Sequence, residues 1–139
     1  MIELFADTAY WIALLLKRDR HHLHALQILR EMRTSVRIVT SEYVLLEFLN
    51  HFSKHGPLAR KDAMKSWRSM YEFEKVEVVP IGNEILQKAA ALYDKSSDKA
   101  WSLTDCSSFV IMRERKIHDA LTFDHHFEQA GFRALLRND

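Results

Sequence analysis

The 139-residue sequence predicts an α/β protein built on a parallel sheet. Short apolar segments of strand type alternate with longer segments that carry a helical apolar spacing, which is the order of parallel sheets covered by helices. Only three glycines and two prolines interrupt the chain. This scarcity favours long helices joined by short connections over a sandwich of hairpins. Because no linker or internal repeat divides the sequence, we expect a single domain over residues 1–139.

The N-terminal third supplies one strand and two helices. Residues 2–6 are a short apolar run that predicts a strand. The apolar segment over about 8–16 predicts a helix, and leucines spaced three residues apart predict another over about 22–32.

The middle of the chain repeats the pattern. Residues 36–39 predict a strand, after which Thr40 or Ser41 caps a helix that runs to about residue 54. The Gly-Pro pair at 56–57 breaks the chain before a further helix over about 59–73.

The C-terminal part adds the remaining elements. Residues 76–79 predict a strand, and about 84–93 a helix, followed by a polar loop over 94–99. Thr104 is expected to cap a helix over about 105–114. Strands at 120–123 and 132–136, with a short helix between them, complete the prediction.

Composition excludes several classes of protein. The chain is 47% hydrophobic and 28% charged, with a formal net charge of +1, so any contact with nucleic acid needs a local basic surface. One cysteine, Cys106, allows no internal disulfide. The apolar run over 9–16 is too short to cross a bilayer and does not follow the pattern of a secretory signal. We therefore expect a cytoplasmic protein without membrane contact.

Three aspartates occupy positions where an open parallel sheet builds its ligand site. Asp7 follows the first predicted strand, Asp124 follows the 120–123 strand, and Asp105 begins a predicted helix. Each has a structural alternative, because Asp105 favours a helix dipole and Asp124 is suited to cap the short helix after it. A cap is a weaker alternative for Asp7, which has apolar neighbours on both sides.

Glu47 interrupts an almost continuous apolar stretch in the predicted 41–54 helix. One interpretation is a solvent-facing position, and the other is that Glu47 shares a cation with the three aspartates. Crowded carboxylates stay ionised only beside cations, and hard oxygen ligands select Mg²⁺ or Mn²⁺. Such ions assist phosphodiester hydrolysis, so the four acids indicate phosphate chemistry.

Four segments resemble the ordered acidic motifs of PIN domains. They are Phe5-Ala6-Asp7-Thr8-Ala9, the helix with Glu47, Leu103-Thr104-Asp105-Cys106, and Leu121-Thr122-Phe123-Asp124-His125-His126-Phe127. The resemblance covers essentially the whole chain, and its C-terminal block is similar to VapC-type toxin ribonucleases.

The resemblance implies a three-layer α/β/α sandwich with a parallel sheet of about five strands. It also implies a Mg²⁺- or Mn²⁺-dependent endoribonuclease that acts on RNA, is held by a small antitoxin and forms a homodimer. By position, Asp7 and Asp105 match the principal metal ligands, with Glu47 and Asp124 completing the catalytic site. Thr8 and Thr122 match small hydroxyl residues that the family places beside its acids.

Basic and histidine residues raise further hypotheses. Lys61, Lys65 and Arg68 share one helix face, opposite Met64 and other apolar residues, and form either a solvated surface or an RNA-binding one. Five histidines fit no standard zinc spacing and are expected in surface loops, namely His21, His22, His24, His125 and His126. His125, beside Asp124, is a candidate substrate contact.

Two other functions stay open from the sequence. A Mg²⁺-dependent phosphatase with an aspartyl nucleophile is disfavoured because position 9 is alanine, where many such enzymes place a second aspartate. A catalytically silent PIN-like protein-binding module is the other alternative, against which the intact acids argue.

Overall fold

A computed structural model describes residues 2–32 and 35–137 of the chain. Its five-stranded sheet has the order β3-β2-β1-β4-β5, and all neighbouring strands are parallel. The strands are β1 (Ile2–Ala6), β2 (Val36–Ser41), β3 (Val76–Val79), β4 (Asp119–Leu121) and β5 (Arg133–Ala134). The predicted α/β class and parallel sheet are confirmed. Residues 1, 33–34 and 138–139 of the predicted domain lie outside the described residues.

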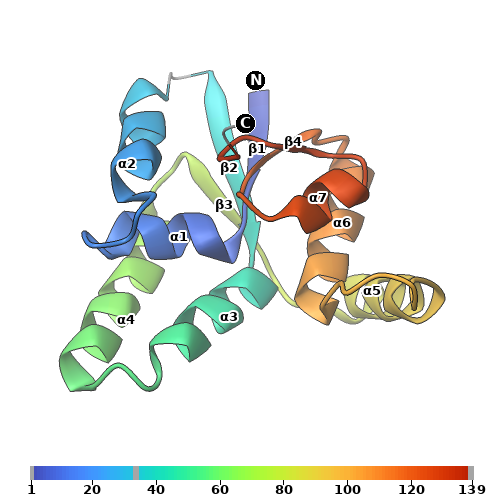
Figure 1. The fold of residues 1–139 in the computed structure, drawn as a ribbon, viewed down its shortest axis with the longest axis horizontal. Helices are drawn as coiled ribbons and strands as arrows, with labels where there is room; N and C mark the ends of the chain where they lie inside the picture. The colour runs from blue at the N-terminus through green and yellow to red at the C-terminus, as the bar shows by residue number, and fades with distance from the viewer. Residues whose placement is uncertain (1, 33–34, 138–139) are drawn as a thin grey trace.

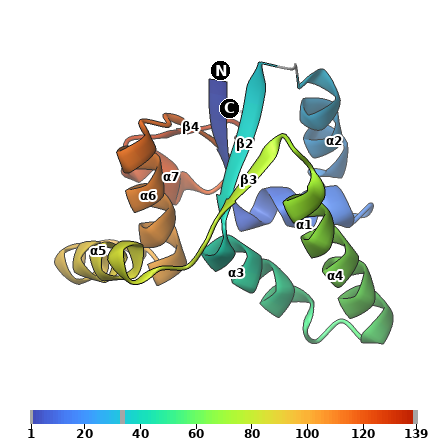
Figure 2. The same cartoon turned by 180° about the vertical axis from the view of Figure 1, so that it is seen from behind.

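Helices cover both faces of the sheet and give the protein three layers, as predicted (Figure 1). One face carries α1 (Thr8–Leu15), α2 (His22–Glu31) and α4 (Pro57–Glu72), and the other carries α5 (Asn83–Lys95), α6 (Leu103–Arg115) and α7 (His125–Gln129). The view from behind shows the same division, with α3 (Glu42–Phe52) beyond the ends of the strands (Figure 2). Within the described ranges, no helix combines the length and the apolar character that a membrane crossing needs.

The strand order creates a crevice at the carboxyl edge of the sheet. β1 lies between β2 and β4, and Phe5 and Ala6 at its end are fully buried. The chain leaves β1 toward α1 on one face and leaves β4 toward α7 on the other (Figure 1). Adjacent parallel strands whose connections diverge in this way leave a ligand-binding crevice between them.

Buried hydrogen bonds fix the helices around this crevice. The indole of Trp11 in α1 donates to Thr40 Oγ1 at 3.2 Å, and the Thr40 hydroxyl donates to the carbonyl of Ala6 at 2.9 Å. These contacts join α1 to the ends of β1 and β2. Ser41 caps α3, because its Oγ accepts from the amide of Val44 at 3.2 Å, so the second of the two predicted caps is correct.

Several boundaries differ from the prediction for local reasons. α4 begins at Pro57, since proline suits the first helical position, directly after Gly56 with φ of 91°. α5 extends to Lys95 into the predicted polar loop. β4 ends at Leu121 because the Thr122 hydroxyl accepts from the amide of Asp124 at 3.1 Å and turns the chain out of the sheet. β5 is only two residues long.

Candidate metal centre

The crevice is a cavity of about 620 Å³, and all four predicted acids line it. Asp7 follows β1, Glu47 lies on α3, Asp105 lies in the first turn of α6, and Asp124 precedes α7. These segments are widely separated in sequence, and the parallel strand order brings them to one edge. The geometric expectation that the four carboxyl groups meet in a single pocket is therefore confirmed.

Asp7 is the most buried of the acids, with 6% of its surface exposed. It occupies the N-cap position of α1, but its carboxylate makes no capping hydrogen bond. Instead, Asp7 Oδ2 accepts from the hydroxyl of Thr122 at 3.0 Å. The helix-cap alternative for Asp7 is thus wrong, because its side chain is directed to the cavity and to Thr122.

Burial raises the pKa of Asp7 to about 7, from an ordinary value of 3.8. The neighbouring charges of Asp105 and Glu47 contribute to this rise of the pKa, whereas hydrogen bonds from the Thr8 backbone and the Thr122 hydroxyl oppose it. The negative charge of the ionised Asp7 carboxylate is therefore poorly stabilised by the protein without a cation.

Glu47 lies at the exposed rim of the same cavity. Its Oε1 accepts from the hydroxyl of Thr8 at 2.5 Å, which joins α3 to the first residue of α1. The solvent-facing interpretation of Glu47 is therefore confirmed, and the same side chain also lines the cavity, while its sharing of a cation stays a prediction. Thr8 and Thr122, the two predicted hydroxyl residues, each donate to one acid of the cluster.

Asp105 both caps its helix and faces the cavity. The prediction that Thr104 caps α6 is wrong, because the helix begins two residues earlier, at Leu103, and Ser102 is its N-cap. Ser102 Oγ accepts from the Asp105 amide at 2.9 Å, while Asp105 Oδ2 accepts from the Ser102 amide at 3.1 Å. This reciprocal pair is a capping box, and it fixes the direction of the Asp105 side chain. Burial raises the pKa of Asp105, and the charge of Asp124 adds to the effect.

Asp124 also has both roles that the sequence left open. Its Oδ1 caps α7 by accepting from the His126 amide at 2.9 Å, and its side chain lines the cavity. His126 Nδ1 lies 3.2 Å from Asp105 Oδ2 and 3.3 Å from Asp124 Oδ1. The imidazole of His126 therefore bridges two acids that belong to different helices.

His126 is a site residue that was not predicted from the sequence, and its expected place in a surface loop is wrong. It lies in the first turn of α7, and its side chain is 19% exposed. The signal was its position two residues after Asp124, because a capping aspartate brings the backbone at this position against its own carboxylate. His51, Phe123 and the exposed His125 also line the cavity.

The donor set fits a divalent cation. Carboxylates that raise each other's pKa are stabilised in the ionised form by a cation among them, and oxygen ligands suit hard cations. Asp7, Glu47, Asp105 and Asp124 are placed to hold such an ion. Ligand atoms of Asp124, His125 and His126 lie within 4.8 Å of one another at the same mouth and add nitrogen donors to the set.

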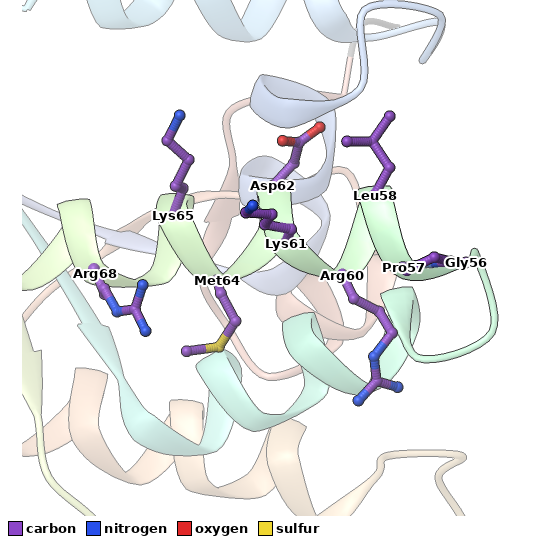
Figure 3. A pocket seen from close by; sticks show the side chains of 9 residues that line it. All are labelled: Gly56, Pro57, Leu58, Arg60, Lys61, Asp62, Met64, Lys65 and Arg68. Atoms are coloured by element: carbon purple, nitrogen blue, oxygen red, sulfur yellow. The ribbon is translucent and has the colours of Figure 1, made fainter.

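The predicted basic residues lie elsewhere. Lys61, Lys65 and Arg68 are exposed on α4 and line a depression of about 990 Å³ together with Arg60 and Met64 (Figure 3). None of the residues lining this depression lines the acidic cavity. Met64, expected on the opposite face, lines the same depression as the cations. The structure thus separates this basic face, defined as Arg60, Lys61, Lys65 and Arg68, from the acids.

Comparisons with known proteins agree with this architecture. The VapC20 protein of Mycobacterium tuberculosis, named a 23S rRNA-specific endonuclease, is 27% identical over 132 residues, which are 93% of this chain and 95% of that protein. Its crystal structure, described as that of a Sarcin-Ricin loop cleaving toxin, has a TM-score of 0.82 at 24% identity and the same coverage. VapBC2 from Rickettsia felis, solved with a DNA fragment from its promoter, has a TM-score of 0.65 at 13% identity, over 96% of this chain and 97% of that one.

Both solved structures confirm the fold, and the sequence supplies the family. The model of the PIN domain family matches residues 4–133, which include all four acids and both threonines of the site. The chain therefore belongs to the PIN domain family.

Proposed function

We propose that this protein is a metal-dependent endoribonuclease that hydrolyses RNA phosphodiester bonds. The observation that carries the proposal is the convergence of Asp7, Glu47, Asp105 and Asp124 on one cavity in a chain of the PIN family. The relative that is named a 23S rRNA-specific endonuclease supports RNA as the substrate class.

In this proposal Asp7 and Asp105 are the principal ligands of Mg²⁺ or Mn²⁺, and Glu47 and Asp124 complete the site. The number of oxygen donors favours these hard ions over zinc. When bound, the cation supplies Lewis-acid chemistry, which polarises the phosphodiester and favours deprotonation of water.

The protein's own side chains hold the acids in place. The Thr122 hydroxyl donates to Oδ2 of Asp7, and the Thr8 hydroxyl donates to Oε1 of Glu47. The imidazole of His126 contacts the carboxylates of both Asp105 and Asp124. Such outer contacts orient ligands and set their basicity, so Thr8, Thr122 and His126 act as positioning residues.

We also propose that the protein is the toxin of a toxin–antitoxin pair, that it forms a homodimer and that it works in the cytoplasm. The relationship to VapC20, whose structure is described as that of a toxin, supports the first statement. The basic face on α4 is proposed to bind RNA phosphates away from the cut, because its cations are exposed on one side of one helix.

Cleavage of RNA by the purified protein tests the function. We expect cleavage with Mg²⁺ or Mn²⁺, none with EDTA, and none in Asp7→Asn or Asp105→Asn variants that retain the wild-type fold by circular dichroism. Release of phosphate from small esters without RNA cleavage would instead identify a phosphatase. Inert protein that still binds a partner would identify a silent binding module, and either result overturns the proposal.

A further inference from the structure

One wall of the acidic cavity is apolar. Ala9 and Ile12 of α1 and Phe123, which directly precedes Asp124, line the cavity beside the acids. Phe123 is only partly buried, although it packs against the hydrophobic core. A phenylalanine at the mouth of a site for polar chemistry therefore presents part of its ring to whatever enters.

The ring of Phe123 is supported from the loop between α1 and α2. The imidazole of His21 stacks on it, with 4.1 Å between ring centroids and 24° between the ring planes. The loop is itself anchored, because the amide of His21 donates to Asp19 Oδ1 at 2.8 Å. Arg137 donates to the carbonyl of Phe123 at 3.3 Å, so both partners of the stack are held in place.

Three basic residues lie on the same loop between α1 and α2. Lys17, Arg18 and Arg20 are exposed, and none of them takes part in an ion pair within residues 2–32 and 35–137. Six other cations among the described residues form ion pairs, as Arg133 does with Asp119 at 2.9 Å. Even with the one acid of the loop, Asp19, the segment that supports the cavity wall carries a net positive charge beside an acidic pocket.

We propose that the stack of His21 and Phe123 is the position where an unpaired nucleobase of the RNA binds, next to the phosphodiester bond to be cut. Lys17, Arg18 and Arg20 contact the phosphates of the adjoining nucleotides. The inference rests on the proposed function and specifies its substrate as RNA that is single-stranded at the cut.

The chemistry of RNA recognition supports this assignment. Unpaired bases bind by stacking on aromatic side chains, whereas a base inside a duplex offers no free face. Cations beside such a platform follow the backbone of the strand and offset the repulsion between the acids and the incoming phosphates. Of the two stacked rings, Phe123 is the one that lines the cavity, so its exposed part is where a base beside the acids would stack.

The test replaces the ring and then restores it. Phe123→Leu keeps an apolar side chain without an aromatic face, and Phe123→Trp keeps the face. In an Asp105→Asn background with Mg²⁺, binding of a labelled single-stranded RNA of about 12 nucleotides is measured, with the same strand annealed to its complement as the second probe. Phe132→Leu is the matched control, because Phe132 is a partly buried phenylalanine outside the cavity.

We expect Phe123→Leu to weaken single-strand binding roughly tenfold or more, and Phe123→Trp and Phe132→Leu to bind as the parent does. With an intact Asp105, Phe123→Leu raises KM for RNA cleavage far more than it lowers kcat. The proposal is overturned if Phe123→Leu keeps both the melting temperature and the single-strand affinity of the parent. It is also overturned if the protein prefers the duplex probe. RNA cleavage that depends on Asp7 would survive that result, so the proposed function is tested separately.

The loop has its own test. In the same background, changing Lys17, Arg18 and Arg20 together to Gln removes three phosphate contacts and lowers the salt dependence of binding, as the slope of log K against log salt, by about 2. The matched control changes Arg30, Lys95 and Lys116 to Gln. These three residues are exposed outside this loop, and the change lowers the net charge by the same amount. An equal loss in both variants would show an effect of overall charge and would contradict the proposed contact.

Discussion

The Thr122 hydroxyl donates to Asp7 Oδ2 at 3.0 Å across 115 positions of sequence. This buried bond joins the end of β4 to the end of β1, so it connects the two strands between which the crevice opens. The same Thr122 oxygen accepts from the amide of Asp124 at 3.1 Å. One side chain thus fixes two of the four acids relative to each other.

We predict that Thr122→Val lowers metal affinity or RNA cleavage roughly ten- to hundredfold, as loss of a hydrogen bond to a metal ligand commonly does. The unfolding free energy falls by about 1 kcal/mol or more, because valine has the shape of threonine but can neither donate to Asp7 nor accept from the Asp124 amide. Calorimetric titration with Mn²⁺ and urea unfolding measure the two effects. Thr122→Ser retains the hydroxyl and should stay close to wild type, and a Val variant with full metal affinity would contradict the role.

The pKa of Asp7 predicts how the stability of the metal-free protein depends on pH. Burial raises this pKa to about 7 in the folded state, above the ordinary value of 3.8. The unfolded chain therefore releases this proton at lower pH than the folded one, and the stabilising contribution, complete below 3.8, is lost as pH rises through about 7. Each unit of difference corresponds to about 1.4 kcal/mol, so the loss amounts to a few kcal/mol.

Urea unfolding with EDTA at about pH 5.5 and about pH 8.5 measures this loss. Asp7→Asn carries no titrating group and should flatten the dependence and stabilise the metal-free protein at the higher pH. Excess Mg²⁺ should restore stability to the wild type at that pH, because a ligand that binds only the folded state stabilises it. A wild-type pH dependence in Asp7→Asn would show that another group causes the effect.

Ser102 offers a test of the corrected helix start. We predict that Ser102→Ala lowers the unfolding free energy by about 1 kcal/mol, because it leaves the Asp105 amide without its cap. It should also reduce RNA cleavage indirectly. The backbone amide of residue 102 still donates to the Asp105 carboxylate, but a first turn without its side-chain cap holds that amide less firmly. Thr104→Ala is the matched control and should lose neither. Destabilisation by Thr104→Ala without a loss in Ser102→Ala would identify Thr104 as the cap, and equal losses would contradict the assignment of Ser102 alone.

Local patterns predicted most of the fold. β1 and β3 were predicted with the bounds that the structure has, because each is a short apolar run closed by polar or breaking residues. The capping box was also present in the sequence as Ser102-Leu103-Thr104-Asp105, but the adjacent threonine is an equally good cap by residue type. Only the helical register, which the packing of α6 sets, distinguishes Ser102 from Thr104.

The sequence predicted that the acids and the two hydroxyl residues beside them lie together, but it did not predict the histidine and the aromatic stack around them. Carboxylates at strand ends carry a signal in sequence, because topology fixes where those ends meet. His126 and the stack of His21 on Phe123 depend on side-chain directions in a five-residue helix and a loop, where no periodicity specifies them. For the same reason, the sequence showed that Lys61 and its neighbours share a face but not that this face lies apart from the acids.

The basic face on α4 leads to a prediction about the affinity for RNA, with the rate of the cleavage step unchanged. We expect the combined change of Lys61, Lys65 and Arg68 to Gln to raise the KM for RNA and reduce the salt dependence of binding by about 2 in slope, if each cation contacts one phosphate. The kcat should stay unchanged, because none of these residues lines the acidic cavity. Cleavage of a long RNA at several salt concentrations measures all three quantities.

The length of the RNA separates this face from the loop near the cavity. A short strand bound at the acids reaches the stack of His21 and Phe123, whose ring lines the cavity, before it can reach a depression that shares no residue with that cavity. The α4 variant should therefore be impaired only with long substrates, whereas the variant of Lys17, Arg18 and Arg20 should be impaired with short ones too. If the α4 variant cleaves long RNA with wild-type KM and salt dependence, this surface is only a solvated helix face, which is the common role of a stripe of exposed charges.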